Sequence, residues 1–151
     1  MSTVEEAIDV LVPVRTAYNQ WTQFEEFPRF MAGVEHVEQL DDTHLHWCAD
    51  IAGVRREWDA RIDEQSPDQR IAWHATRGSK NAGVVTFHRI DDTTTRVMLQ
   101  LEFDPEGFVE RSGDVLGFVR RRATSDLEHF KDYIEARGSE SGAWRGKIEN
   151  T

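Results

Sequence analysis

Two arginines occupy positions where the pattern of the chain calls for apolar side chains, and a guanidinium group there could bind an oxygen of a small molecule. Arg56 lies in the apolar phase of an alternating segment, two residues before Trp58. Arg120 lies about 40° from the centre of the apolar stripe of a helical segment, at about 100° per residue. An unpaired buried charge is costly, so each needs a carboxylate partner, an escape to solvent, or a ligand carbonyl, enolate or carboxylate. Arg56 and Arg120 are therefore candidate cationic anchors of a hydrophobic, oxygen-bearing ligand.

Large aromatic side chains share the apolar phase of successive alternating segments. This alternation predicts strands with one buried and one wet face. Small-molecule sites are typically apolar and aromatic with a few polar anchors, but rings of this size also fill protein cores. Both interpretations stay open at this point. The apolar residues predicted to bind a ligand, if a pocket exists, are Phe27, Met31, Trp47, Trp58, Trp73, Phe87 and Leu99.

A run of alternating polar residues resembles a metal site at first sight, since His44, His46, Cys48 and Asp50 share one face of a segment. That face is opposite Trp47, however, and is expected to be wet. An extended strand spreads these side chains over about 20 Å, so one ion cannot reach all four. The sequence also lacks a P-loop, a GxSxG elbow and an HExxH pattern. We predict no metal site and no cofactor.

The elements that position these residues follow from the hydrophobic period. Residues 4–12 are predicted to form a strand ending at Pro13, residues 14–21 a short helix, and residues 24–31 a second helix or an irregular turn. Period-two alternation predicts six further strands near residues 34–40, 44–51, 55–64, 70–76, 83–90 and 95–103. The short connections between them favour antiparallel neighbours.

After residue 105 the period changes, and apolar residues from Leu116 to Ile134 recur at three- and four-residue steps. This spacing predicts a long helix that ends near Arg137 and Gly138. The long helix is the element available to cover the apolar face of the sheet. The predicted fold is therefore α+β: a curved antiparallel seven-stranded sheet that grips a long C-terminal helix, with two short helices after the first strand. Residues 1–137 form one domain, and the Gly/Ser-rich residues 138–151 form a flexible tail.

Composition limits the classes of partner. The formal net charge of −10 in 151 residues disfavours nucleic acid, because phosphate binding depends on Lys and Arg. The single cysteine, the acidic N-terminus and the absence of a long apolar run predict a cytoplasmic protein without stable membrane insertion. Phe118 is expected on the wet side of the long helix, against the tail or in a dimer contact, so a monomer and a homodimer both remain open.

Several stretches of the chain resemble those of a known superfamily. They include V-E-E-A-I-D-V at the start, W-T-Q-F-E-E-F-P-R-F-M from Trp21, R-E-W-D-A-R-I from Arg56, N-A-G-V-V-T-F from Asn81 and L-E-H-F-K-D-Y-I-E from Leu127. Over residues 3–137 the sequence resembles the START-like (SRPBCC) superfamily, in its polyketide cyclase/dehydrase and coenzyme-Q-binding branch. This resemblance implies a deep, largely apolar cavity between sheet and helix. It leaves the chemistry open, because the superfamily includes cyclases, dehydratases and lipid or quinone carriers.

The function expected from these observations is binding of a hydrophobic small molecule, such as a polyketide, an aromatic or an isoprenoid-like compound, between the sheet and the C-terminal helix. An alternative is an aromatase/cyclase-dehydratase type of enzyme, and a further alternative is a protein-interaction or stress-associated module that uses the helix and tail. Binding is favoured over catalysis because no His, Asp or Glu lies clearly in the inward phase, and the catalytic residues of an enzyme would be unknown.

Overall fold

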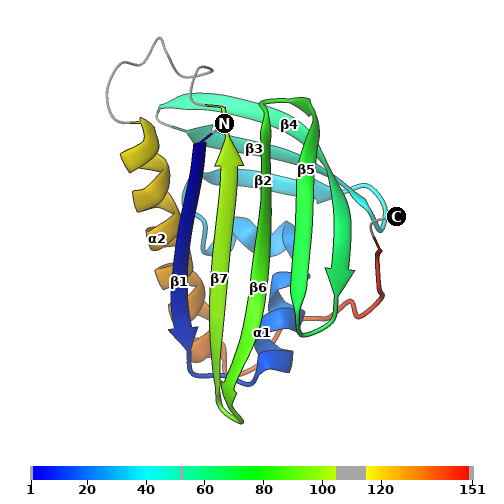
Figure 1. Cartoon of the computed structure of the whole chain (residues 1–151), viewed down its shortest axis with the longest axis vertical. Coiled ribbons are helices and arrows are strands. Elements are labelled where there is room, and N and C mark those ends of the chain that lie inside the picture. Colours follow the sequence, from blue (N-terminus) through cyan, green and yellow to red (C-terminus); the bar gives the residue numbers. More distant parts are fainter. Residues whose placement is uncertain (1, 52, 105–114, 150–151) are drawn as a thin grey trace.

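The computed structural model describes residues 2–51, 53–104 and 115–149 and shows a seven-stranded antiparallel sheet with a long C-terminal helix (Figure 1). The strands are β1 (Ser2–Val10), β2 (Val34–Gln39), β3 (His44–Ile51), β4 (Val54–Ser66), β5 (Arg70–Gly78), β6 (Asn81–Asp91) and β7 (Thr94–Phe103). The helices are α1 (Val14–Trp21), the 3₁₀ helix η1 (Phe24–Arg29) and α2 (Val115–Arg137). The predicted fold class and order of elements are confirmed.

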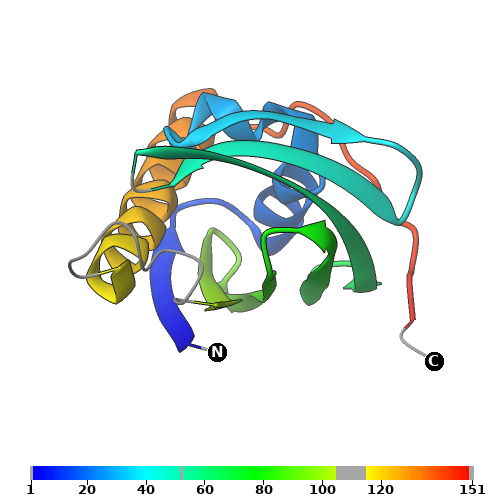
Figure 2. The same cartoon turned by 90° about the horizontal axis from the view of Figure 1, so that it is seen from above.

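The sheet is curved, and its order is β1-β7-β6-β5-β4-β3-β2. In the view from above, it curls around α1, while α2 lies along its open side (Figure 2). The long strand β4 shifts register twice against β5, at Asp59/Ala60 and at Ile62/Glu64. Bulges of this kind bend a strand and increase its twist, which accounts for the curl at this part of the sheet.

One half of the interior is filled by aromatic rings. Trp21 of α1 contacts Phe130 of α2 with ring centroids 4.8 Å apart, and Phe30 contacts the same ring at 5.2 Å. Tyr18 of α1 packs edge-on against Phe87 of β6 at 5.3 Å. All of these residues are buried. The two short helices therefore fill this end of the concave face, and edge-to-face packing of this kind stabilises the core beyond simple burial of area.

The segment after α2 returns across the domain and makes specific contacts up to Glu149, although we expected a flexible tail. It bonds to four polar residues that are buried: Asn19, Gln20, Thr22 and Gln65. Arg145 donates two hydrogen bonds to the carboxylate of Asp68, at 3.0 and 2.9 Å. The backbone of Ile148 exchanges hydrogen bonds with that of Gln65. Residues 140–148 thus bond to the buried side chains of Asn19, Gln20 and Thr22 and to the backbone of Gln65.

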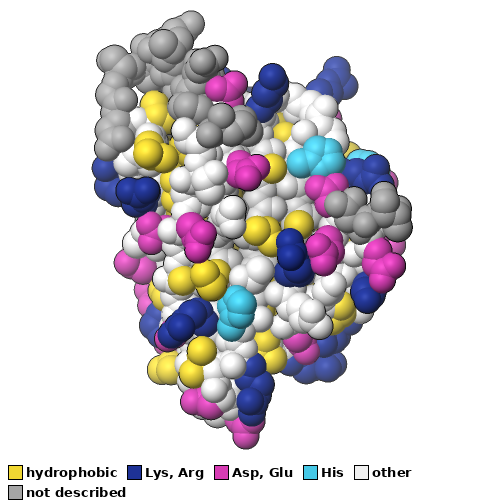
Figure 3. All heavy atoms as spheres, in the orientation of Figure 1, with side chains coloured by type: hydrophobic (Ala, Val, Ile, Leu, Met, Phe, Trp, Pro, Cys, Tyr) yellow, Lys and Arg dark blue, Asp and Glu magenta, His cyan; other side chains and the backbone are white. Residues whose placement is uncertain are grey.

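The outer face of β1, β7, β6 and β5 carries charged side chains of both signs among scattered hydrophobic ones (Figure 3). Among the helices of the described residues, none has the length and apolar character needed to cross a bilayer.

Candidate functional site

A cavity of about 390 Å³ lies between the concave face of the sheet, the helix η1 and the first half of α2. Most of its lining is apolar or aromatic. Seven of the nine residues predicted to bind a ligand line it: Phe27, Met31, Trp47, Arg56, Trp58, Trp73 and Leu99.

Two stacked tryptophans form one wall. Trp47 of β3 and Trp58 of β4 are direct cross-strand partners, and their rings are nearly parallel, at 9° with centroids 5.7 Å apart. Phe27 of η1 lies against Trp47 at 5.5 Å. The alternation of each strand turns both indoles inward, and pairing without an offset in register brings them together. Both indole N–H groups are buried and have no hydrogen-bond acceptor among the described residues.

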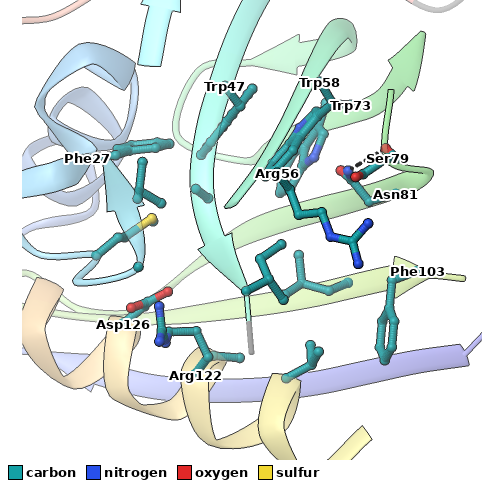
Figure 4. A pocket seen from close by; sticks show the side chains of 18 of the residues that line it. Phe27, Trp47, Arg56, Trp58, Trp73, Ser79, Asn81, Phe103, Arg122 and Asp126 are labelled. Carbon is teal, nitrogen blue, oxygen red and sulfur yellow. Dashed lines mark hydrogen bonds between the residues drawn. The ribbon is translucent and has the colours of Figure 1, made fainter. Parts of the chain in front are cut away.

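Arg56 comes from β4 two residues before this wall and is half-buried. Figure 4 shows its guanidinium extending into the cavity, on the side where the β5–β6 turn carries Ser79 and Asn81. The side-chain amide of Asn81 donates to the backbone oxygen of Ser79 at 3.0 Å, which fixes the shape of that turn. Arg56 is thus a cation at an apolar wall, as the sequence pattern indicated.

Two predicted residues lie outside the cavity lining. Phe87 is buried in the filled half of the interior, where it contacts Tyr18 and Trp21. Arg120 is 56% exposed in its side chain and pairs with Glu6 of β1 at 3.7 Å. The apolar phase of β6 was identified correctly, but the alternation of one strand does not tell which part of the concave face another helix will fill. Arg120 escapes to solvent because its stem can extend past the edge of the helix.

The helix presents two charged residues to the cavity that the sequence reasoning missed. Arg122 and Asp126 both line it, and Figure 4 shows them side by side on α2. They belong to the face Val119, Arg122, Ala123, Asp126, Phe130, with steps of three and four residues, so the spacing itself contained the signal. The predicted stripe, whose centre was set by Leu116, Ala123 and Ile134, did not include Arg122 or Asp126, and its first member, Leu116, is 39% exposed.

Phe118 also corrects an expectation, because it lines the cavity and is half-buried. The guanidinium of Arg122 lies over its ring, 5.3 Å from the centroid. In the first half of α2, the residues that line the cavity therefore span a larger part of the helix circumference than the apolar stripe alone.

Asp126 is electrostatically unusual. Its Oδ1 atom is buried and has no hydrogen-bond partner among the described residues. Burial raises the pKa of this carboxyl from 3.8 to about 7, and the charge of Arg122 acts in the opposite direction. A carboxyl group that titrates near neutral pH in a cavity can hold or release a proton under physiological conditions.

The alternating His/Cys face of β3 has protein partners. His46 Nδ1 lies 2.6 Å from Asp59, and Cys48 donates to Glu35 at 3.1 Å. Cys48 is buried, contrary to its expected position on a wet face. In the part of the chain that the structure describes, no group of three or more His, Cys, Asp or Glu residues is arranged to hold a metal ion.

Comparison with known proteins agrees with this architecture. The family described as polyketide cyclase/dehydrase and lipid transport matches residues 10–132. The chain belongs to this family. It is 58% identical over 149 residues to a Streptomyces lincolnensis protein, an uncharacterized 17.2 kDa protein in the melC2-rnhH intergenic region, with 98% of this chain and 99% of that one covered.

Two solved structures show the same fold at low sequence identity. The Zhui aromatase/cyclase from Streptomyces sp. R1128 superposes with a TM-score of 0.77 at 18% identity, covering 95% of this chain and 99% of that one. A START superfamily protein from Mycobacterium smegmatis gives a TM-score of 0.69 at 16% identity, covering 89% and 95%. The resemblance to the START-like superfamily stated from the sequence is confirmed.

Proposed function

We propose that this protein binds a hydrophobic small molecule that carries acceptor oxygens, in the cavity between the sheet and α2. The observation that carries the proposal is an apolar, aromatic cavity of about 390 Å³ into which Arg56 projects. Cavities of this size and character are typical of small-molecule sites, with apolar burial giving affinity and a few polar groups giving orientation. Each buried CH₂ group of a ligand contributes about 0.8 kcal/mol.

The polar groups of the sheet wall favour acceptor oxygens on the ligand. The guanidinium of Arg56 is a donor without acceptor capacity. The indole N–H groups of Trp47 and Trp58 also donate, and these two groups have no acceptor among the described residues. Because buried donors that lack an acceptor are costly, a carbonyl, phenolate or carboxylate oxygen suits this wall better than an ammonium group.

The test is native mass spectrometry of freshly purified protein, followed by solvent extraction and identification of any retained compound. The wild type is expected to carry a hydrophobic compound or to bind one from a panel of polyketides, quinones and fatty acids with a rise in Tm. Arg56→Ala should weaken binding at least tenfold, whereas Arg120→Ala is the matched control, since Arg120 is exposed outside the cavity. No retained compound and no shift in Tm across the panel would refute the proposal.

A second candidate function, a cyclase/dehydratase type of enzyme, is favoured by Asp126. With a pKa of about 7, this carboxyl can act both as base and as acid near neutral pH. In a dehydration of a β-hydroxy ketone, the carboxylate would remove the α-proton, and Arg56 would stabilise the enolate oxygen. The same proton would then pass to the leaving hydroxyl group, which departs as water while the C=C bond forms.

This candidate is tested with 4-hydroxy-4-phenylbutan-2-one, whose dehydration product absorbs in the ultraviolet. An enzyme should accelerate the reaction over buffer, Asp126→Asn should abolish the acceleration without weakening binding, and Arg120→Ala should leave both unchanged. Equal rates for the wild type and Asp126→Asn would contradict catalysis by Asp126 and would favour ligand binding as the function of the cavity.

A further inference from the structure

We propose that Arg122 and Asp126 form a proton-controlled anion subsite on the α2 wall of the cavity. With Asp126 ionised, the two charges compensate each other and the wall accepts neutral ligands. With Asp126 protonated, the charge of Arg122 is left to bind the carboxylate of a hydrophobic ligand. This inference rests on the proposed function, since it concerns which ligands the same cavity selects.

The guanidinium of Arg122 occupies the space next to Gly33 that a side chain at that position would fill. A Cβ atom placed on Gly33 would coincide with Nη1 of Arg122 and would also come close to its Cζ. Gly33 lies in the loop between η1 and β2 and lines the same cavity. Arg122 therefore reaches from α2 to that loop, and its guanidinium also lies over the ring of Phe118, 5.3 Å from the centroid. Glycine at position 33 therefore leaves room for the guanidinium of Arg122 at the cavity wall.

Asp126 lies one helical turn after Arg122, on the same face of α2, which is the spacing at which two helical side chains interact. Its buried Oδ1 accepts no hydrogen bond from the described residues. Arg122 is the charge that lowers the pKa of Asp126, against the larger effect of burial. Because electrostatic coupling is mutual, the state of Asp126 decides how much of the positive charge of Arg122 is compensated.

The other charged groups around this wall belong to separate pairs or lie elsewhere on the lining. On β1, Glu6 is paired with Arg120, and on η1, Glu26 is paired with Arg29. On β3, the Asp50 carboxylate accepts the backbone N–H of Gly53 at 3.0 Å. The remaining charged residues that line the cavity are Arg56, Lys80, Glu102 and Asp104. Asp126 has a pKa of about 7 and lies one helical turn from Arg122, so we expect the pH dependence to come from this pair.

Linkage gives the expected size of the effect. If an anionic ligand binds only when Asp126 is protonated, its Kd is constant well below the pKa of about 7 and rises about tenfold per pH unit above it. A neutral ligand of the same shape shows no such dependence. Because both ligands make the same apolar contacts, the ratio of their affinities reports the contribution of the Arg122–Asp126 subsite alone.

The experiment uses 2-naphthoate and 2-naphthamide, which share one ring system and differ in charge, measured by isothermal titration calorimetry at about pH 6 and about pH 8.5. We expect naphthoate to bind about tenfold or more tighter at the lower pH, with naphthamide unchanged. Asp126→Asn should bind naphthoate well at both pH values. Arg122→Gln should lose the preference for naphthoate, and Arg122→Lys, which keeps the charge, should retain its pH dependence.

An acid-to-amide affinity ratio that is equal at the two pH values would overturn the inference. Failure of both probes to bind at about pH 6 would overturn it as well. The proposed function is judged separately, by whether the cavity retains any hydrophobic compound in the native mass spectrometry experiment, so the two ideas can fail independently. Circular dichroism and the Tm of each variant confirm that it is folded before its affinities are compared.

Discussion

Replacing Asp126 by Asn is expected to stabilise the protein at high pH and to have little effect at low pH. The pKa of this carboxyl is raised from 3.8 to about 7 in the folded chain, chiefly by burial. A raised pKa means that the folded state holds the proton more tightly than the unfolded state. Its favourable contribution is present below about pH 4 and is lost as the pH rises through about 7. At about 1.4 kcal/mol per pKa unit, the difference corresponds to about 4 kcal/mol as an upper bound.

Asn cannot ionise, so it avoids that cost. The free energy of unfolding of Asp126→Asn should exceed that of the wild type by about 2–4 kcal/mol at pH 8.5 and by about 1 kcal/mol or less at about pH 4.5, and the two should nearly coincide at about pH 3. Urea unfolding at four pH values measures the difference, and pH effects from the rest of the acidic chain cancel in it. Glu128→Gln, which removes an exposed carboxylate from the same helix, controls for the lost charge. If the difference in free energy of unfolding between Asp126→Asn and the wild type did not change with pH, the raised pKa of this buried carboxyl would be refuted.

Three further predictions concern packing and paired charges. Gly33→Ala should lower the free energy of unfolding by about 1–3 kcal/mol, because its Cβ takes the place of the Arg122 guanidinium, and Arg122→Ala should rescue it in a double-mutant cycle; an unrescued loss would contradict that contact. Arg145→Ala should cost about 1.5–3 kcal/mol in urea unfolding by breaking charged hydrogen bonds of the tail, and an unchanged midpoint would show that the tail does not stabilise the domain. His46 has a raised pKa, chiefly through its hydrogen bond to Asp59, so its stabilisation is present below about pH 6.5 and is lost as the pH rises through the folded value. His46→Gln should therefore destabilise more at about pH 6 than at about pH 9, by up to about 1 kcal/mol, and equal losses would be inconsistent with this pair.

The strands could be predicted because the alternation of apolar and polar residues along each strand indicates which of its two faces is buried. Trp47 and Trp58 have the same phase in neighbouring segments joined by a short turn, and in the structure they are direct cross-strand partners. The tail was harder, since its contacts are polar and come from the whole of the domain. Nothing near Arg145 in the sequence indicates that Asp68, far away in the chain, will be its partner.

The helix shows why the polar groups of the cavity were missed. A hydrophobic stripe locates the face that packs against apolar neighbours, and the buried residues of this stripe in α2 are Ala123, Leu127, Phe130 and Ile134. Towards its start, α2 faces a cavity instead of a packed layer, so charged side chains can occupy its inner surface. Arg120 was predicted as an anchor because it lies near the apolar stripe when that stripe is extrapolated from the packed half of α2 into the half that faces the cavity. The space next to Gly33 belongs to another element and could not be read from the helix.

Some of the large aromatic residues of the sheet belong to the packed core, and others line the cavity. Sheet strands such as β4, with 13 residues, are longer than the 8-residue helix α1 can cover. Phe87 therefore faces α1 and is part of the solid core, while Trp58 and Trp73 lie beyond the reach of that helix and line a hollow. A chain that only needed to fold could fill this space with larger apolar side chains and gain stability, since burial of apolar surface contributes about 25 cal/mol per Å². A hollow of about 390 Å³ that also admits Arg56 therefore supports the proposal that the cavity is a ligand site.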